Sequence, residues 1–313
     1  MENKKNILLQ CHERIQPYVH RTPVLTSRLI NTLAKTDVFF KCENFQRGGS
    51  FKIRGAINAI LQRPHEQRNK AVVTHSSGNF AQALSLAAKG LGVEAFIVMP
   101  ATAAQVKKDA VQEYGGKIIE CEPTLAARNA AAKKIEIETG ATFIHPSNDE
   151  NVILGQGTAC IELLEEHPDL NFVITPVGGG GLIAGTSLAA YYFGDKCNVI
   201  GGEPFEADDA YRAMKSGKIE SNTTTNTIAD GLKTQLGDMN FPIMQKYMDS
   251  IVRVTENKII EAMRLIWERM KIIVEPSSAV ALAVILTDTE RFKNKKTGII
   301  ISGGNVDLNT LPF

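Results

Sequence analysis

Short apolar segments alternate with longer helical patterns along most of this 313-residue chain. The short segments are continuously apolar, which is typical of parallel strands that helices cover on both faces. We expect strands near 38–41, 71–74, 95–99, 117–120, 142–145, 172–175, 198–201 and 298–301. We expect helices near 50–62, 78–90, 104–114, 124–138, 151–166, 180–193, 256–272 and 276–287. This alternation predicts an open α/β fold rich in parallel sheet. The length suggests two domains, since a domain usually holds about 150 residues.

The composition excludes several classes of function. The net charge is +1, so no long-range field favours nucleic acid or an anionic membrane. The five cysteines are scattered and form no CxxC pair, which argues against a disulfide framework and a thiolate zinc site. The N-terminal stretch is charged and lacks the apolar core of a signal peptide. We therefore expect a cytoplasmic enzyme without nucleic-acid or membrane partners.

A run of four glycines, Gly178 to Gly181, stands between an apolar strand pattern and a helical pattern. Glycines let backbone N–H groups converge on an anion, and the start of the following helix adds its dipole. A glycine run can also be only a tight turn. The strand before it and the helix after it favour phosphate binding.

A nicotinamide dinucleotide would fit the same loop. Gly179, Gly181 and Ala184 match the pattern G-x-G-x-x-G/A. Glu203 ends the next strand about twenty residues on, where a ribose-binding acid would stand. An NAD-dependent dehydrogenase is therefore an alternative from another class, and a non-catalytic ligand-binding module is a third.

Lys52 lies in the segment SFKIRGA, where Ser50 could cap a helix and Lys52 would fall in its first turn. Its neighbours Phe51 and Ile53 are apolar, which indicates partial burial. A lysine that loses solvent near positive charge acquires a lowered pKa and becomes a nucleophile for carbonyl groups. A solvated surface lysine is the alternative.

Two more clusters follow predicted strands. Ser76, Ser77 and Asn79 (SSGN) stand between a strand and a helix, where they could bind a ligand or merely cap the helix. Ser302 (SGGN) comes at the end of the last strand. Ligands of open α/β sheets gather at the carboxyl ends of strands, so Ser302 is a candidate site residue.

The order SFKIRGA, SSGN, GGGG and SGGN resembles the motifs of fold-type II pyridoxal-phosphate enzymes, in the branch of serine racemases and serine/threonine dehydratases. The resemblance extends from about Thr22 to Leu308 and includes LGQGT, TIADG and WERMK. It implies a two-domain fold like that of the tryptophan synthase β chain. A small domain of residues 71–149 would be inserted into a large cofactor-binding domain of residues 1–70 and 150–313.

The resemblance also implies roles for individual residues. Lys52 would hold pyridoxal 5'-phosphate as a Schiff base, Asn79 would bind the phenolic oxygen of its ring, and Ser302 would face the ring nitrogen. The cofactor phosphate would lie on Gly178, Gly179, Gly180 and Gly181. The substrate would be held or faced by Ser76, Ser77, Asn79 and Arg128.

Two further ligands are implied by the same resemblance. Glu203, Ala207 and Asp209 would supply two carboxylates and a backbone carbonyl to a divalent cation, Mg²⁺ or Ca²⁺. Acids at a helix start can instead only complement its dipole. ATP as an activator would use Ser27, Arg47, Gln82, Tyr114 and Asn305.

The chain departs from the family pattern at four positions. Phe80 stands where the family usually has histidine after SSGN, so any hydrogen bond of that histidine is lost. Ser147 replaces an asparagine that is often found after His-Pro. Arg28 and Gly48 differ from the nucleotide-binding region of the mammalian relatives, which weakens the expectation of activation by ATP.

The implied activity is interconversion of L- and D-serine, with accompanying elimination of serine to pyruvate and ammonia. Lys52 would take the Cα proton on one face, and Ser77 would return a proton on the other. A threonine or 3-hydroxyaspartate dehydratase without a racemase role is the nearest alternative. A homodimer is implied by analogy with the family.

Overall fold

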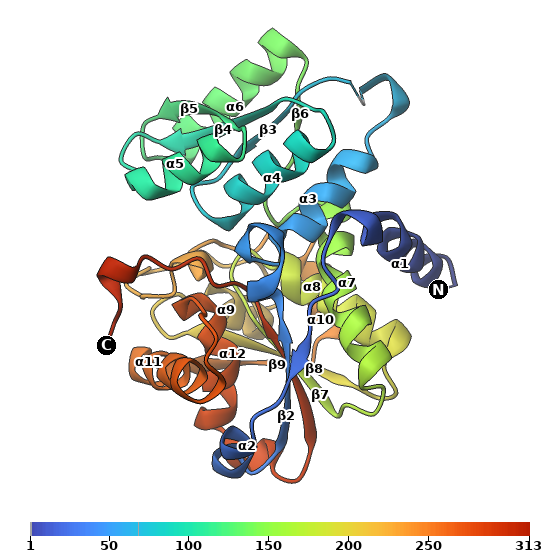
Figure 1. Ribbon diagram of the computed structural model, residues 1–313, viewed down its shortest axis with the longest axis vertical. Helices are drawn as coiled ribbons and strands as arrows, with labels where there is room; N and C mark the ends of the chain where they lie inside the picture. Colours follow the sequence, from blue (N-terminus) through green and yellow to red (C-terminus); the bar gives the residue numbers. More distant parts are fainter. Residues whose placement is uncertain (1, 68) are drawn as a thin grey trace.

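The computed structural model describes residues 2–67 and 69–313, and it contains two sheets stacked along the long axis of the molecule (Figure 1). The six-stranded sheet has the order β1-β2-β10-β7-β8-β9, and the four-stranded sheet has the order β5-β4-β3-β6. Among the described strands, only β1 and β2 pair antiparallel. The expected open α/β fold with parallel-rich sheets is therefore confirmed.

The elements have the following bounds. The strands are β1 Val24–Leu25, β2 Asp37–Cys42, β3 Val72–His75, β4 Ala95–Pro100, β5 Lys117–Cys121, β6 Thr142–Phe143, β7 Phe172–Pro176, β8 Asn198–Pro204, β9 Ser250–Val254 and β10 Lys296–Ile301. The α-helices are α1 Glu2–Ile15, α2 Arg28–Ala34, α3 Lys52–Leu61, α4 Asn79–Gly90, α5 Gln105–Glu113, α6 Leu125–Thr139, α7 Glu150–Glu166, α8 Gly181–Phe193, α9 Asp209–Ser216, α10 Phe241–Tyr247, α11 Glu256–Leu265, α12 Pro276–Thr287 and α13 Thr289–Phe292.

Helices cover both faces of the six-stranded sheet, and this explains its continuously apolar strands. Ile300 belongs to the core that α1, α7, α8 and α10 close. Its neighbours Ile299 and Ile301 belong to the opposite core, under α2, α11 and α12. Successive side chains of a strand point to opposite faces, so a strand between two cores must be apolar at every position. The four-stranded sheet is covered in the same way, by α4 on one face and α6 on the other.

Some elements differ from the sequence expectation. Strands β1 and β9 and helices α1, α2, α9, α10 and α13 were not expected. Strand β6 ends at Phe143 instead of residue 145, because the ring of His145 accepts backbone N–H bonds from residues 147 and 148 and turns the chain. The helix expected over 256–272 continues beyond Leu265 as a π-helix, η6 (Ile266–Met270). Within the described residues, no helix is long and apolar enough to cross a bilayer.

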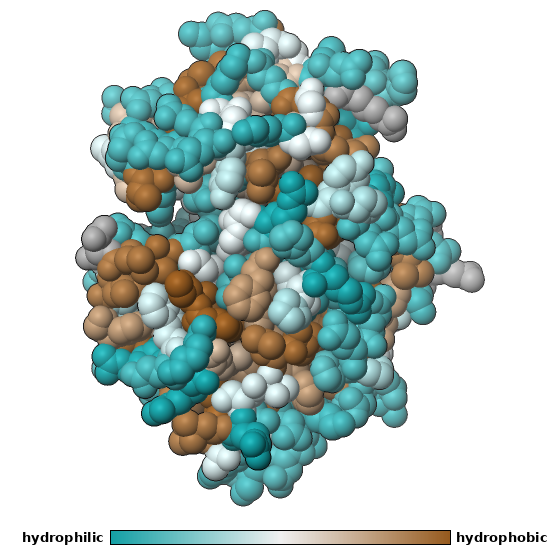
Figure 2. Space-filling model, in the orientation of Figure 1, coloured by the Kyte–Doolittle hydropathy of each residue, from teal (hydrophilic) through white to brown (hydrophobic). Residues whose placement is uncertain are grey.

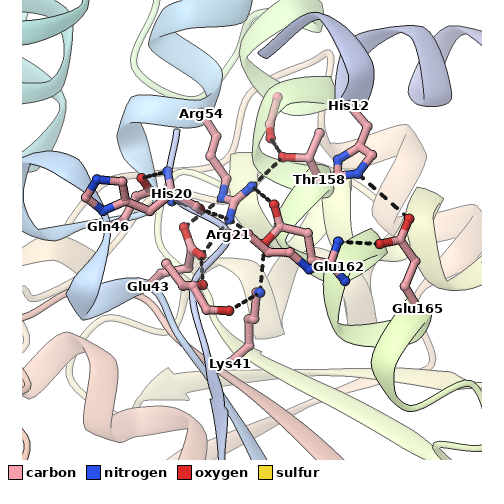
Figure 3. A network of polar contacts seen from close by, with 12 residues as sticks. His12, His20, Arg21, Lys41, Glu43, Gln46, Arg54, Thr158, Glu162 and Glu165 are labelled. Atoms are coloured by element: carbon pink, nitrogen blue, oxygen red, sulfur yellow. Dashed lines mark hydrogen bonds and ion pairs between the residues drawn. The ribbon is translucent and has the colours of Figure 1, made fainter. Parts of the chain in front are cut away.

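A buried ion network fixes helix α3 to its surroundings (Figure 3). Arg54 on α3 donates to Glu43 after β2 at 2.7 and 2.8 Å and to Glu162 on α7 at 2.7 and 2.9 Å. Nζ of Lys41 on β2 lies 2.7 Å from Oε2 of Glu162, an oxygen that also accepts from Arg54. The two positive and two negative side chains are fully or almost fully buried. Their charges balance, and the guanidinium is satisfied on both edges.

The network is electrostatically tight. Burial alone would raise the pKa of Glu162, but Arg54 and Lys41 outweigh burial and hold the pKa of this carboxyl below its usual range. A buried ion network adds little net stability compared with apolar packing, whereas removal of one partner leaves an uncompensated buried charge. Arg54 therefore ties the start of α3 firmly to β2 and α7.

We predict that E162Q lowers the free energy of unfolding by about 3 kcal/mol, because it leaves Arg54 and Lys41 with one carboxylate between them. Chemical denaturation measures this change. The matched control is E165Q on the same helix, whose carboxylate pairs with Arg21 at 2.7 Å but is 43% exposed. E165Q should change stability by about 1 kcal/mol or less. Equal effects of the two variants would contradict the importance of the buried network.

Candidate active site

Lys52 begins helix α3 and points between the two sheets. Its Nζ donates to the backbone carbonyl of Pro146 at 2.9 Å. The same atom lies 5.0 Å from the ring centroid of Phe51 and 5.7 Å from that of Phe80. The cap residue of α3 is Phe51, so Ser50 does not cap the helix as expected, and its Oγ has no hydrogen-bond partner. The lysine of the sequence analysis is therefore enclosed, and a solvated surface lysine is excluded.

Two neighbouring groups of this site have shifted pKa values. Burial lowers the pKa of Lys52 to about 8, although the carboxylate of Glu275 acts in the opposite direction. Burial raises the pKa of Glu275 to about 7, against the effect of a hydrogen bond from Asn79. Each of the two groups can therefore gain or lose a proton near neutral pH, which is typical of residues that perform acid–base chemistry.

The glycine run forms a cradle at the start of α8. Gly180 is the cap residue and has a φ of 81°, a left-handed conformation that favours glycine. A Cβ atom at Gly179 would lie 2.4 Å from Oγ of Ser147, and one at Gly180 would lie 2.6 Å from Oδ1 of Asn240. In the described part of the chain, the amides of residues 178–181 donate to no other group. The loop can hold an anion such as phosphate on these amides and the helix dipole.

Asn79 and Ser302 lie beside Lys52. Nδ2 of Asn79 donates to both carboxylate oxygens of Glu275, at 3.0 and 3.1 Å, and its Oδ1 accepts from Asn305 at 2.9 Å. The carbonyl of Ser302 accepts from the amide of Phe51, the residue before Lys52, at 3.0 Å. The structure thus brings the residues of four separate sequence motifs together at the carboxyl ends of strands.

The other substrate candidates lie on the four-stranded half. Ser76 and Ser77 form the half-buried turn from β3 to α4, directly before Asn79. Arg128 lies in the first turn of α6, and its charge lowers the pKa of His75 in addition to the larger effect of burial. Arg128 therefore lies close enough to the end of β3 for its charge to act on His75, the residue before Ser76 and Ser77.

Glu203 and Asp209 form a buried pair of carboxylates. Burial raises the pKa of Glu203 well above its usual range, and Asp209 adds to this effect. Burial raises the pKa of Asp209 to about 6. Oδ1 of Asp209 is buried without a hydrogen-bond partner, and Ala207 between them is fully buried. Two repelling carboxylates and an unpaired oxygen fit the hard oxygen ligands that a divalent cation prefers.

The position of Glu203 argues against the dinucleotide interpretation. Its Oε1 accepts from the amide of Ala210 at 3.0 Å and its Oε2 from that of Tyr211 at 2.8 Å. Both oxygens thus face the start of α9 instead of the space above the glycine loop. A ribose-binding acid must present its carboxylate to the ligand hydroxyl beside the glycine loop. Glu203 instead presents its oxygens to the start of α9, next to Asp209, and each oxygen keeps a lone pair there that a cation can use.

The five nucleotide candidates do not converge within one chain. Asn305 donates to the carbonyl of Gly48 at 2.9 Å, next to Arg47. Helix α4, which carries Gln82, contacts both this turn and α5, which ends before Tyr114. Ser27 caps helix α2 at the far end of the six-stranded half (Figure 1). A nucleotide site that includes Ser27 would require a second copy of the chain.

Sequence reasoning missed two groups at this site. Glu275 was given no role, because an acid before proline at a helix start resembles ordinary capping. His145 was not considered. Burial, with His75 and Lys52, lowers the pKa of His145 to about 4, so its ring is a neutral acceptor. Its Nδ1 accepts from the amide of Asn148 at 2.8 Å and holds the loop whose Pro146 carbonyl meets Lys52.

A half-buried lysine with a lowered pKa and a glycine loop that can hold an anion, at the carboxyl ends of parallel strands, are the groups that an α/β enzyme needs to bind a phosphorylated carbonyl compound. The family model for pyridoxal-phosphate dependent enzymes matches residues 15–303. The chain therefore belongs to the family of pyridoxal-phosphate dependent enzymes.

Individual relatives are similar over nearly their whole lengths. The chain is 47% identical to β-hydroxyaspartate dehydratase of Paracoccus denitrificans (strain Pd 1222), covering 98% of this chain and 97% of that protein. It is 49% identical to serine racemase of Dictyostelium discoideum, covering 96% and 94%. The crystal structure of Dictyostelium discoideum serine racemase superposes with a TM-score of 0.93 at 48% identity, covering 97% and 99% of the two chains.

We predict that E275Q changes the pH dependence of stability. The pKa of Glu275 rises from an ordinary value of 4.5 to about 7 in the folded protein. A raised carboxyl pKa stabilises the folded state at low pH, and this contribution is lost as the pH rises through 7. A glutamine does not ionise, so E275Q keeps its stability as the pH rises. Its free energy of unfolding relative to that of wild type should therefore increase by up to about 3 kcal/mol between pH 4.5 and pH 8.

Denaturant unfolding at both pH values measures the difference. E268Q is the control, because Glu268 is 51% exposed on η6 and remote from any buried charge of the site. Its stability should follow wild type at both pH values. If E275Q also followed wild type, the carboxylate of Glu275 would not be held at a raised pKa.

Proposed function

We propose that this enzyme racemises serine and also eliminates serine to pyruvate and ammonia. The observation that carries the proposal is the enclosed amine of Lys52, which meets the loop of Pro146 at 2.9 Å beside the glycine cradle. The similarity to serine racemases at 43–49% identity supports serine as the substrate.

The cofactor site would be formed by residues of both halves. Lys52 would hold pyridoxal 5'-phosphate covalently, residues 178–181 would bind its phosphate, Asn79 would contact the phenolic oxygen, and Ser302 would face the ring nitrogen. When bound, the cofactor supplies an electron sink for the substrate Cα. The lowered pKa of Lys52, about 8, leaves a far larger fraction of its amine uncharged near neutral pH than an ordinary lysine has, and only the uncharged amine can act as a base.

Proton transfer at Cα would then decide the product. Lys52 takes the Cα proton on one face, and Ser77, on the β3–α4 turn, returns a proton on the other to give the mirror-image amino acid. If the β-hydroxyl leaves before Ser77 donates, serine ends as pyruvate and ammonia. Ser76, Asn79 and Arg128 would hold the substrate, since a guanidinium suits a carboxylate.

We further propose that residues 71–149 form a small domain that closes over the site. Figure 2 shows the surface indented between the two halves on the left of the view. Contacts that already bridge the halves include the ion pair of Lys107 on α5 with Asp230 at 2.7 Å and the hydrogen bond that Asn79 donates to Glu275. Closure would exclude water from the reacting atoms.

A second candidate activity is dehydration of 3-hydroxyaspartate. The 47% identity to a β-hydroxyaspartate dehydratase favours it. This substrate carries a second carboxylate, which needs another cation in addition to Arg128. Comparison of kcat/KM for serine and for 3-hydroxyaspartate distinguishes the two substrates, and racemisation of serine is the outcome that the dehydratase alone would not give.

The remaining expectations are proposals of the same kind. Glu203, the carbonyl of Ala207 and Asp209 would bind Mg²⁺ or Ca²⁺. ATP would bind between two chains of a homodimer, because Ser27 lies far from Arg47, Gln82, Tyr114 and Asn305 in one chain. The enzyme would act in the cytoplasm.

We predict that L-serine supplied to the enzyme with pyridoxal phosphate yields both D-serine and pyruvate. S77A should abolish D-serine formation and spare pyruvate formation, because only Ser77 serves the second face. Chiral chromatography and a coupled pyruvate assay measure the two products. K52A should form neither product. It should also lack the visible absorption band that a Schiff base between lysine and pyridoxal phosphate gives and that borohydride removes.

S76A is the neighbouring control, since Ser76 would contact substrate without transferring a proton. S76A should raise KM for both reactions and leave their ratio unchanged. Equal loss of both products in S77A would show that Ser77 is not the second proton donor. Ammonia release without any D-serine from wild type would leave a dehydratase.

We predict that Mg²⁺ or Ca²⁺ raises the unfolding temperature of wild type but not of D209N. An ion at one hundred times its dissociation constant stabilises the folded state by about 3 kcal/mol. The matched control is D208N, because Asp208 is adjacent in sequence but pairs with Arg212 and Arg253, each at 2.8 Å. D208N should keep the ion-dependent shift. A shift that survives in D209N would exclude this site.

A further inference from the structure

The ammonium of Lys52 rests against two aromatic rings. Nζ lies 5.0 Å from the ring centroid of Phe51 and 5.7 Å from that of Phe80. Both rings are buried, with 8% and 2% of their residue surfaces exposed. Phe51 precedes Lys52 on the chain, whereas Phe80 comes from the first turn of α4 in the other half of the molecule. Phe80 is therefore a contact that depends on how the two halves meet.

We propose that Phe80 is a positioning residue for Lys52, and that its ring, with that of Phe51, receives the lysine side chain whenever this is free and protonated. The inference rests on the proposed role of Lys52 as the proton acceptor. A base that takes the Cα proton becomes an ammonium and must keep that proton until it is returned. The two rings and the Pro146 carbonyl are the groups that meet Nζ in this position.

The physical reason is the quadrupole of the ring. The face of an aromatic ring attracts a cation within about 6 Å and does not attract a neutral amine, and the attraction grows when water is excluded. Phe80 thus favours the protonated lysine, in the direction opposite to burial. The titratable groups that act on Lys52 from other elements are Glu275, which also favours the ammonium, and His145, whose lowered pKa keeps it neutral near pH 7.

The side chain at position 80 therefore sets how readily Lys52 holds a proton. A phenyl ring does this without a titration of its own. Neither a hydrogen bond nor a second ionisation links residue 80 to the lysine. Phe80 should consequently influence the proton-transfer step and not the affinity for substrate.

The test measures the pKa of Lys52 directly, through cofactor capture. Protein freed of cofactor is mixed with pyridoxal phosphate at a series of pH values, and the rate of appearance of visible absorption reports the fraction of uncharged Lys52. We expect F80L to lower this pKa by about half to one unit, since a leucine keeps the apolar volume but removes the ring. F80M should do the same, and it serves if F80L folds poorly.

The matched control is F96L. Phe96 on β4 also has a lysine over its ring, Nζ of Lys117 at 5.7 Å, but Lys117 is 62% exposed. F96L should leave the capture profile unchanged. In the holoenzyme, F80L should shift the pH profile of kcat in the same direction as the capture profile and leave KM within about twofold of wild type.

An unchanged capture profile in folded F80L or F80M would overturn the proposal, and so would an equal shift in F96L. A rise in KM without any shift of the profiles would also overturn it, because Phe80 would then act on substrate. Capture does not require serine, so these outcomes are independent of whether the enzyme is a racemase. Failure of wild type to capture the cofactor would instead overturn the proposed function itself.

Discussion

The ion network around Arg54 is the interaction on which the site depends. Arg54 is the third residue of α3, and its guanidinium is held by Glu43 and Glu162 from opposite sides. Because four charges are buried together, the network has one arrangement that leaves no charge unpaired. The start of α3 is thereby fixed relative to β2 and α7. Lys52 lies two residues earlier on the same helix, so its backbone is held in place as well.

The site shows what that rigidity permits. A half-buried lysine and a buried carboxyl group act on each other electrostatically, and loss of solvent moves the pKa of Lys52 down to about 8 and that of Glu275 up to about 7. Both shifts mean that the charged form of the group is costly in the folded protein. Each group therefore lowers the free energy of unfolding in the pH range where it is charged. A flexible site would relax and let water in. Here the ion network holds the start of α3, and Lys52 and Glu275 keep the shifted pKa values that proton transfer requires.

Much of the fold follows from the sequence because most of the expected strands lie between two cores. Ile299, Ile300 and Ile301 form a continuous apolar run, and they divide between opposite helical layers. Strand β9 was missed because Arg253 interrupts its apolar run; this half-buried side chain pairs with the buried Asp208. Helix α1 was missed because its charged residues conceal a narrow buried stripe that includes Leu8 and Cys11. These elements are defined by what covers them, which local sequence does not contain.

The site residues also divide into those that the local sequence predicts and those that it does not. The glycine cradle, Lys52 and Ser302 could be found because each depends on its own strand and turn. The choice between a dinucleotide and a pyridoxal cofactor could not be made locally, because the glycine pattern serves both. That choice depends on residues distant in sequence: Pro146 meets Lys52, and Ser147 packs against Gly179. Glu203 directs both oxygens to α9. A phosphate cradle acquires its specificity from the side chains that the fold brings to it, so contacts across the two halves decide the chemistry.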